Sequence, residues 1–544
     1  MAKRRRYLQL DEPLRHRDHS RPVTRREFVR QGFIGGSAFA LSGGVFSMFA
    51  NPRQAMAAVS SDLNSLASDI GCALGGLSGD KKLPFICFDL AGGANFAGSN
   101  VLVGQAGGQM DLLTTSGYSK MGLPGDIIPG LTDTTLAGTM LSTSDGDFTN
   151  SQLGLKFHSD SAMLFGILSK FTPAPGTIDG TVIPARSDND TGNNPHNPMY
   201  GIAKAGANGG VVTLIGSRNS ESGGNSMAPT AFNNPEIRPT KVDRPSDVTG
   251  MVDVGDLTAV LSDPADVTAV MESMARISHK KIRLGTITPG VNVTKDEVIK
   301  DLLQCGYLKA ADIAQRFAGV QVDPSLDTNI VNDSTGIFTT SEFNNDGEFR
   351  KTASVMKMVI DGHAGAGCIT MGGYDYHTGD RQVGENRDLR AGRCIGACLE
   401  YARRMAQPVM IYVFSDGSVA SNGRIDNSMP SGNNQLGGRG KGEWTGDNSS
   451  TACSFFLIFD PTGGITINSA SGLLDHRQIG WYSGDGSVVT SSSPAANNVN
   501  LLVNTVIANY LSLNGDIGLL SSLVPNHGLG DVDRVVPFGP LANL

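Results

Sequence analysis

The chain has 544 residues, of which 39% are hydrophobic, enough for one large α/β domain with insertions or for two or three smaller domains. Its formal net charge is −8, and an acidic chain is a poor candidate for nucleic-acid binding. Beyond the N-terminal region, no run is apolar and long enough to span a bilayer. We therefore expect no transmembrane segment in the mature chain.

The first 57 residues have the order of an export signal. A basic segment contains an arginine pair at 25–26, a mildly apolar run follows at 32–50, and a small-residue site, A-M-A, ends at Ala57. This order resembles a twin-arginine signal peptide and predicts a periplasmic or secreted protein. The segment carries 11 Lys and Arg against 4 Asp and Glu, which leaves 33 basic and 48 acidic residues in the rest, a net charge of −15. A basic tail before a helix and a permanent N-terminal anchor are the alternatives.

The rest of the chain alternates between short apolar runs and stretches with helical periodicity. Continuous apolar runs are typical of strands that are buried on both faces, so we expect a mainly parallel sheet with helices on each side, an α/β fold. The expected strands are 83–91, 211–216, 368–371, 409–414 and 454–459, and the expected helices are 159–170, 349–362, 388–405 and 497–513.

Other segments do not fit this alternation. Residues 58–82 are expected to form an N-terminal arm, and residues 83–544 the α/β domain. Within it, residues 217–350 read as a helical insertion or cap, because they contain helix-start signals and apolar stripes at helical spacing. Residues 430–450 are rich in glycine, asparagine and serine, and we predict a flexible surface loop there.

The seven cysteines are expected to act mainly as small buried hydrophobic residues. Cys394 and Cys398 fall on one face of an expected helix, which favours packing over redox chemistry. An odd number in an exported chain leaves at least one thiol unpaired within the monomer.

Polar side chains follow three of the expected strands. Asn95 and Ser99 follow the first, Asp375 and His377 follow the strand at 368–371, and Asp416 follows the next. The carboxyl ends of parallel strands lie at one edge of a sheet, where ligands bind, so these groups can converge. Oxygen ligands and one histidine suit Zn²⁺, Mn²⁺, Mg²⁺ or Ca²⁺. A loop serine such as Ser99 is a candidate nucleophile, although such serines are more often turn residues.

Three motifs in this order carry a family resemblance: FDLAGGANFAGSN (88–100), GGYDYH (372–377) and VFSDGS (413–418). They resemble the landmarks of the exported bacterial family called domain of unknown function 1501, in the alkaline phosphatase and sulfatase-like superfamily. The resemblance covers residues 83–480 in outline. It implies a three-layer α/β/α sandwich with a metal site at the carboxyl edge of the sheet, and twin-arginine signals are common in the family.

The chain departs from the family pattern at several positions. Asn95 stands where the family has aspartate, Asp416 where it has glutamate, and Ser418 where it has arginine. A later Thr-Asp-His-Gly element has its nearest counterpart at 445–447, Thr-Gly-Asp, without the histidine. Within GGYDYH, the aspartate and the histidine match the family.

Two functions fit these patterns. The first is a degenerate family member that acts in envelope binding or assembly and holds a divalent cation. The second is a metal-dependent hydrolase of phosphate or sulfate esters, with Asp375, His377 and Asp416 as ligands and an activated water or Ser99 as nucleophile. An oxidoreductase is a third hypothesis that rests only on the export route. The sequence leaves the substrate, the metal, the partner and the oligomeric state open.

Overall fold

The computed structural model describes most of the chain that follows the predicted signal peptide, while residues 1–57 lie outside the described residues. The described part divides into two compact units. The described residues are 59–72, 82–133, 142–187, 194–253, 261, 263–284, 293–317 and 320–542.

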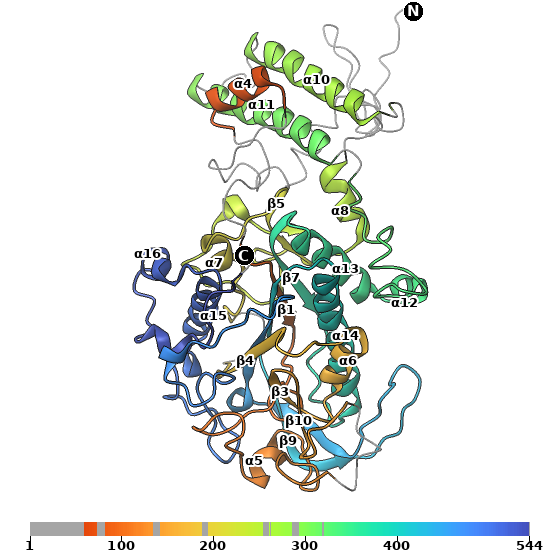
Figure 1. Cartoon of the computed structure of the whole chain (residues 1–544), viewed down its shortest axis with the longest axis vertical. Helices are drawn as coiled ribbons and strands as arrows, with labels where there is room; N and C mark the ends of the chain where they lie inside the picture. Colours follow the sequence, from red (N-terminus) through yellow and green to blue (C-terminus); the bar gives the residue numbers. More distant parts are fainter. Residues whose placement is uncertain are drawn as a thin grey trace, which may run out of the picture. The chain divides into compact units, whose positions relative to one another are not determined.

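The larger unit is built around a seven-stranded sheet with the order β4-β11-β8-β1-β7-β5-β6 (Figure 1). The five strands from β8 to β6 run parallel to one another. Strand β11 is antiparallel to both β8 and β4. The predicted α/β fold with a mainly parallel sheet is confirmed. The strands are β1 (Phe85–Leu90), β4 (Ile178–Pro184), β5 (Val212–Gly216), β6 (Thr240–Lys241), β7 (Ala364–Met371), β8 (Val409–Phe414) and β11 (Cys453–Phe459).

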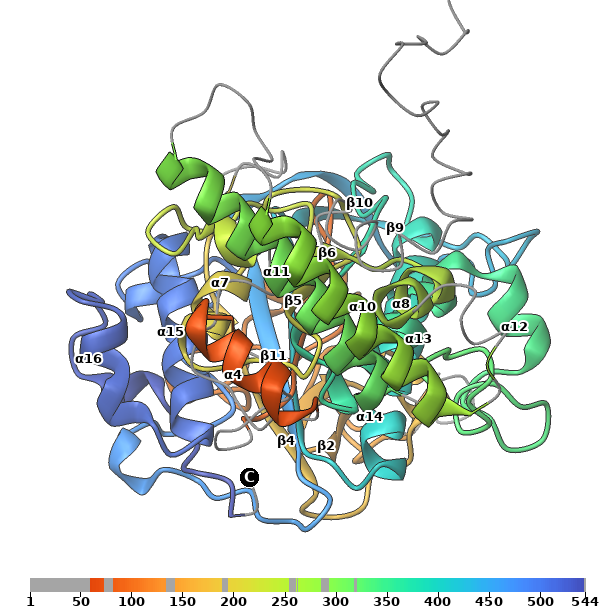
Figure 2. The same cartoon turned by 90° about the horizontal axis from the view of Figure 1, so that it is seen from above.

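Helices cover both faces of this sheet. Helices α7 and α15 lie on one face, and α13 and α14 lie on the other, with α6 packed against α14 (Figures 1 and 2). The bounds are α6 (Ala162–Lys170), α7 (Met199–Lys204), α13 (Gly347–Ile360), α14 (Gln382–Arg404) and α15 (Val499–Leu513). Shorter helices of this unit are α5 (Thr115–Lys120), α12 (Thr340–Asn345) and α16 (Leu520–Leu523). Helix α8 (Pro245–Val252) begins in this unit, and its last two residues belong to the smaller one.

Strand β1 is the centre of the core, because all six of its residues are buried and it pairs with β7 and β8. Alternate residues of the strands point to opposite faces. Phe85 and Cys87 of β1 therefore belong to the cluster formed with α7 and α15. On the opposite face, a Cβ atom at Gly367 of β7 would meet the side chains of Val355 and Val359 on α13.

Glycines allow α6 and α14 to approach closely. A Cβ atom at Gly392 would meet the carbonyl oxygen of Met163, and one at Gly396 would meet the carbonyl oxygen of Ile167. From the other side, a Cβ atom at Gly166 would meet the carbonyl oxygen of Leu389. Backbone atoms cannot move aside as a flexible side chain can, so the spacing of these two helices depends on the missing side chains.

Three helices are described in the smaller unit. They are α4 (Ser61–Asp69), α10 (Pro264–Leu284) and α11 (Val293–Arg316). A disulfide between Cys72 and Cys305 joins the segment after α4 to α11, and the other five cysteines are buried free thiols. Residues 251–320 of this unit fall within the predicted insertion at 217–350. Among the described helices of the chain, none is long and apolar enough to cross a membrane.

The prediction of a flexible loop at 430–450 is wrong over its second half. Strand β10 (Lys441–Asp447) pairs antiparallel with β9 (Val419–Asp426), and Trp444 is fully buried. Two of its other buried residues, Lys441 and Glu443, are charged. The strand therefore lacks the alternation of apolar and polar residues by which strands are predicted. A second hairpin, β2 (Thr149–Leu153) with β3 (Leu155–His158), is also absent from the strands expected from the sequence.

The glycine contact between α6 and α14 can be tested with Gly392→Ala. We expect this variant to lower the free energy of unfolding by about 1–3 kcal/mol, because the added methyl group overpacks a backbone contact. Gly250→Ala in α8 is the matched control, since a Cβ atom there meets nothing within 4 Å, and alanine in a helix is favoured by up to about 1 kcal/mol. Urea unfolding followed by tryptophan fluorescence measures both. Equal stabilities would contradict the close-contact explanation.

Candidate metal site

The loop after β7 alternates between buried and exposed side chains. Tyr374 and Tyr376 are each 1% exposed, whereas Asp375 and His377 point outward with 56% and 37% of their side-chain surface exposed. An extended backbone places successive side chains on opposite sides. The sequence Y-D-Y-H therefore sends its two tyrosines into the protein and presents its aspartate and histidine together at the surface.

The two tyrosines anchor the loop. The Tyr374 hydroxyl donates to the backbone carbonyl of Arg387 in α14 at 2.9 Å. The Tyr376 hydroxyl accepts a hydrogen bond from the backbone N–H of Asn95 at 2.9 Å, and its ring centroid lies 6.2 Å from that of Trp444. These contacts connect the loop to a helix, to the loop after β1 and to the β9–β10 hairpin.

Strand β10 brings a third candidate ligand to this loop. The backbone N–H of Trp444 donates to the carbonyl of Asp380 at 3.0 Å, and the N–H of Gly379 donates to the carbonyl of Trp444 at 3.0 Å. Three residues further along, Asp447 ends the strand. The end of the 372–380 loop is therefore paired with β10, and Asp447 is placed beside Asp375 and His377.

Asp375, His377 and Asp447 form the candidate metal group. Nε2 of His377 lies 2.6 Å from Oδ1 of Asp375 and 3.8 Å from Oδ1 of Asp447. One ligand atom from each residue lies within 4.8 Å of the others, and this is the only group of three or more such ligands found among the described residues. Two carboxylate oxygens and one imidazole nitrogen suit Zn²⁺ or Mn²⁺ better than the all-oxygen sites typical of Mg²⁺ and Ca²⁺.

The structure brings together Asp375 and His377, as predicted from the sequence, but leaves Asp416 outside this group. Asp416 is buried, and its Oδ1 accepts a hydrogen bond from the backbone N–H of Gly92 at 2.8 Å. Its Oδ2 accepts one from the side-chain amide of Asn225 at 3.1 Å. The carboxylate thus supports the glycine turn after β1, and Asp447 takes the place that the sequence predicted for it.

Asp89, near the end of β1, forms a buried acidic pair with Asp416. Its Oδ2 accepts hydrogen bonds from the backbone N–H groups of Asn225 at 2.6 Å and Ser226 at 2.8 Å. Burial, together with the neighbouring charge of Asp416, raises the pKa of Asp89 to about 6. Asn225 therefore contacts both carboxylates, with its backbone N–H on Asp89 and its side-chain amide on Asp416. At this part of the sheet edge, the carboxylates are hydrogen-bonded to groups of the protein itself.

Asn95 and Ser99, predicted as a ligand and a nucleophile, are both fully buried. The Asn95 side-chain amide donates to the carbonyl of Val419 at 2.5 Å. Within the described residues, neither the Asn95 Oδ1 atom nor the Ser99 hydroxyl has a hydrogen-bond partner. Both side chains are therefore inside the protein, whereas His377 is partly exposed. Their position follows from the loop after β1, which packs its polar residues inward.

The sequence did contain a signal for the missed ligand. Asp447 belongs to the Thr-Gly-Asp segment at 445–447, the nearest counterpart of a family element. Its neighbourhood was misread because the glycine-rich composition of 430–450 indicated a loop. Recognising strand β10 from its buried Trp444 would have placed Asp447 at a strand end.

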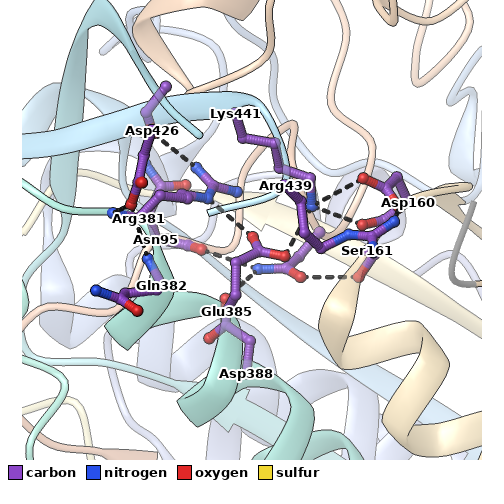
Figure 3. Close-up of polar contacts among 12 residues, drawn as sticks. Asn95, Asp160, Ser161, Arg381, Gln382, Glu385, Asp388, Asp426, Arg439 and Lys441 are labelled. Atoms are coloured by element: carbon purple, nitrogen blue, oxygen red, sulfur yellow. Dashed lines mark hydrogen bonds and ion pairs between the residues drawn. The ribbon is translucent and has the colours of Figure 1, made fainter. Parts of the chain in front are cut away.

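A buried charged network fixes β10 to the start of α14 (Figure 3). Glu385 accepts hydrogen bonds from Nε of Arg381 at 2.8 Å and from Nζ of Lys441 at 2.9 Å. Lys441 also lies 3.4 Å from a carboxylate oxygen of Asp160. The Arg381 guanidinium stacks 4.2 Å from the centre of the Trp444 ring. Removing one member of such a network costs about 3–5 kcal/mol, because an unpaired charge remains buried.

Asp388, one turn further along α14, is a buried acid next to this network. Its Oδ2 accepts a hydrogen bond from the side-chain amide of Asn100 at 2.8 Å. Burial raises the pKa of Asp388 to about 7, because the interior disfavours the ionised form. Near neutral pH, this carboxyl group therefore changes between its protonated and ionised forms.

The raised pKa of Asp388 predicts a pH-dependent stability. Between its unfolded pKa of about 4 and its folded pKa of about 7, the folded chain binds more protons. The contribution of Asp388 to the free energy of unfolding therefore falls as pH rises through this window. We expect Asp388→Asn to gain stability relative to wild type over that window, by at most about 4 kcal/mol at 1.4 kcal/mol per pKa unit.

Urea unfolding at several pH values measures the difference. Asp126→Asn, at an exposed position, is the control, and a pH-independent difference for Asp388→Asn would contradict the assignment.

Comparisons of the chain with protein-family models, with curated proteins and with solved structures find no match.

Proposed function

We propose that this protein is exported and binds a divalent cation through Asp375, His377 and Asp447, and that the bound cation holds an envelope partner. The observation that carries the proposal is the meeting of these three ligands within 4.8 Å at the surface. The Arg-rich order of residues 1–57 supports export.

Three protein ligands leave part of the coordination of a divalent cation open. A four-coordinate zinc ion would have one position for water or for a ligand from another molecule. About half of each carboxylate side chain is exposed, 56% for Asp375 and 53% for Asp447. A partner with a carboxylate or phosphate oxygen can therefore reach the position, so we propose an oxyanion-bearing envelope component as the ligand.

The surrounding residues favour binding over catalysis. Ser99 is buried, which removes the serine that the sequence offered as a nucleophile. Asp416 bonds Gly92 and Asn225, so it does not supply a second metal centre. These positions support a divergent relative of the domain of unknown function 1501 family that has an alkaline phosphatase-like sheet and a single cation site.

Hydrolysis of phosphate or sulfate esters is the second candidate function. The open coordination position favours it, since a divalent cation can lower the pKa of a bound water and stabilise charge on an ester oxygen. Asp375, His377 and Asp447 would then hold the cation while the ester approaches from solvent.

The cation site predicts a specific loss of metal binding. His377→Ala, Asp375→Ala and Asp447→Asn should each weaken Zn²⁺ or Mn²⁺ binding by about 100-fold or more, because loss of an outer partner alone costs roughly 10–100-fold. Elemental analysis and calorimetric titration of the purified mature protein measure this. Asp126→Asn is the control for removing an exposed carboxylate and should bind as wild type does. Equal affinity of Asp447→Asn and wild type would remove Asp447 from the site.

An ester-hydrolysis assay separates the two functions. With the cation loaded, we expect no turnover of aryl phosphate or aryl sulfate above the level of the His377→Ala variant. Cation-dependent turnover that His377→Ala abolishes would instead establish the hydrolase. The cation titration decides independently whether the site exists at all.

A further inference from the structure

A cavity of about 720 Å³ lies in the larger unit, and its lining contains none of the three candidate metal ligands. Its walls come mainly from three segments late in the chain, within 471–481, 491–494 and 529–535. The volume falls in the range of about 300–1,000 Å³ that is typical of ligand pockets.

One part of the wall is apolar. Trp481, Leu473, Leu529 and Val535 all line the cavity. Trp481 is partly exposed, whereas the other tryptophan of the chain, Trp444, is fully buried. A partly exposed indole offers a broad, rigid apolar face together with a polar N–H edge. Such a surface suits a ligand that has both C–H faces and polar groups.

Another part of the wall is rich in hydroxyl groups. Ser491, Ser492 and Ser493 line the cavity in succession. The hydroxyl oxygens of Ser492 and Ser493 are buried and have no hydrogen-bond partner in the described part of the chain. They lie against Gly480, where an added Cβ atom would come within 2.9 and 3.1 Å of them. Ser491 is exposed, and a hydroxyl can both donate and accept, so this wall suits a ligand with hydroxyl groups of its own.

The charged residues of the lining are paired. Asp475 accepts a hydrogen bond from Nε of Arg477 at 2.7 Å. At the rim, Arg534 lies 3.7 Å from Asp531. With its carboxylates next to guanidinium groups, the cavity has no strong excess of either charge. This balance disfavours a strongly anionic or cationic ligand, because such a ligand would lose its hydration without gaining a counter-charge.

We propose that this cavity is a binding site for an uncharged saccharide. A sugar ring combines apolar C–H faces, which match Trp481 and the leucines, with hydroxyl groups, which match the serines. Its neutrality matches a lining in which Asp475 is paired with Arg477 and Arg534 with Asp531. This second site is independent of the cation site, and it would give the protein a contact with glycans of its surroundings.

The proposal can be tested by titrating the full mature protein with a panel of soluble neutral hexasaccharides built from glucose, mannose, xylose or N-acetylglucosamine. We expect at least one to change the tryptophan fluorescence at millimolar concentration, and calorimetry to confirm its binding. Trp481→Ala should weaken that binding by at least about tenfold, as is typical when an aromatic anchor is removed. Ser491→Trp fills the cavity from an exposed position and should have the same effect, which covers the case in which Trp481→Ala fails to fold.

Leu519→Ala, which removes a half-exposed side chain outside the cavity lining, is the matched control and should bind as wild type does. Binding should also survive chelation of divalent cations, which separates this site from the cation site. The proposal is overturned if no member of the panel binds, or if both cavity variants bind as wild type does. It is also overturned if chelation abolishes the binding.

Discussion

The position of the candidate metal group depends on a buried network of ion pairs. None of the three candidate ligands belongs to that network. Glu385 at the start of α14 takes hydrogen bonds from Arg381 and from Lys441 of β10. Charges this deeply buried lose their hydration, so they are tolerated only when each finds its partner. The position of β10 along α14 is thereby restricted to one in which Lys441 reaches Glu385. Asp447 lies six residues further on the same strand, and its place beside His377 follows from that restriction.

Much of the sheet was predictable because β1, β5, β8 and β11 are mostly apolar. The expected strand at 409–414 has the observed bounds of β8, and the runs that became β1, β5 and β11 were found to within a residue or two. β4 and β10 were missed for different physical reasons. β4 lies at the end of the sheet and contains Asp179 and Gly180 among its apolar residues. β10 is buried through paired charges and one tryptophan, which hydrophobic periodicity cannot detect.

The candidate site was half predictable. The alternation Y-D-Y-H and its place after a buried strand were enough to bring Asp375 and His377 together at the carboxyl edge of the sheet. The same reasoning placed Asn95 and Asp416 with them, because it gives the edge on which a residue lies but not its depth. Depth is decided by contacts between loops that are far apart in sequence, such as that of Asp416 with the N–H of Gly92. A single sequence carries little information on such contacts.

The disulfide between Cys72 and Cys305 joins two cysteines that are 233 residues apart in the sequence, and it closes the chain between them into a covalent ring. The part of the chain inside this ring contains β1, β4 and β5. Several strands of the central sheet therefore lie, in sequence, between two cysteines of the smaller unit. A protease that cuts the backbone once inside the ring leaves both pieces joined in one molecule until the disulfide is reduced. In an oxidising compartment, the protein would therefore tolerate a nick in its surface loops without shedding its N-terminal part.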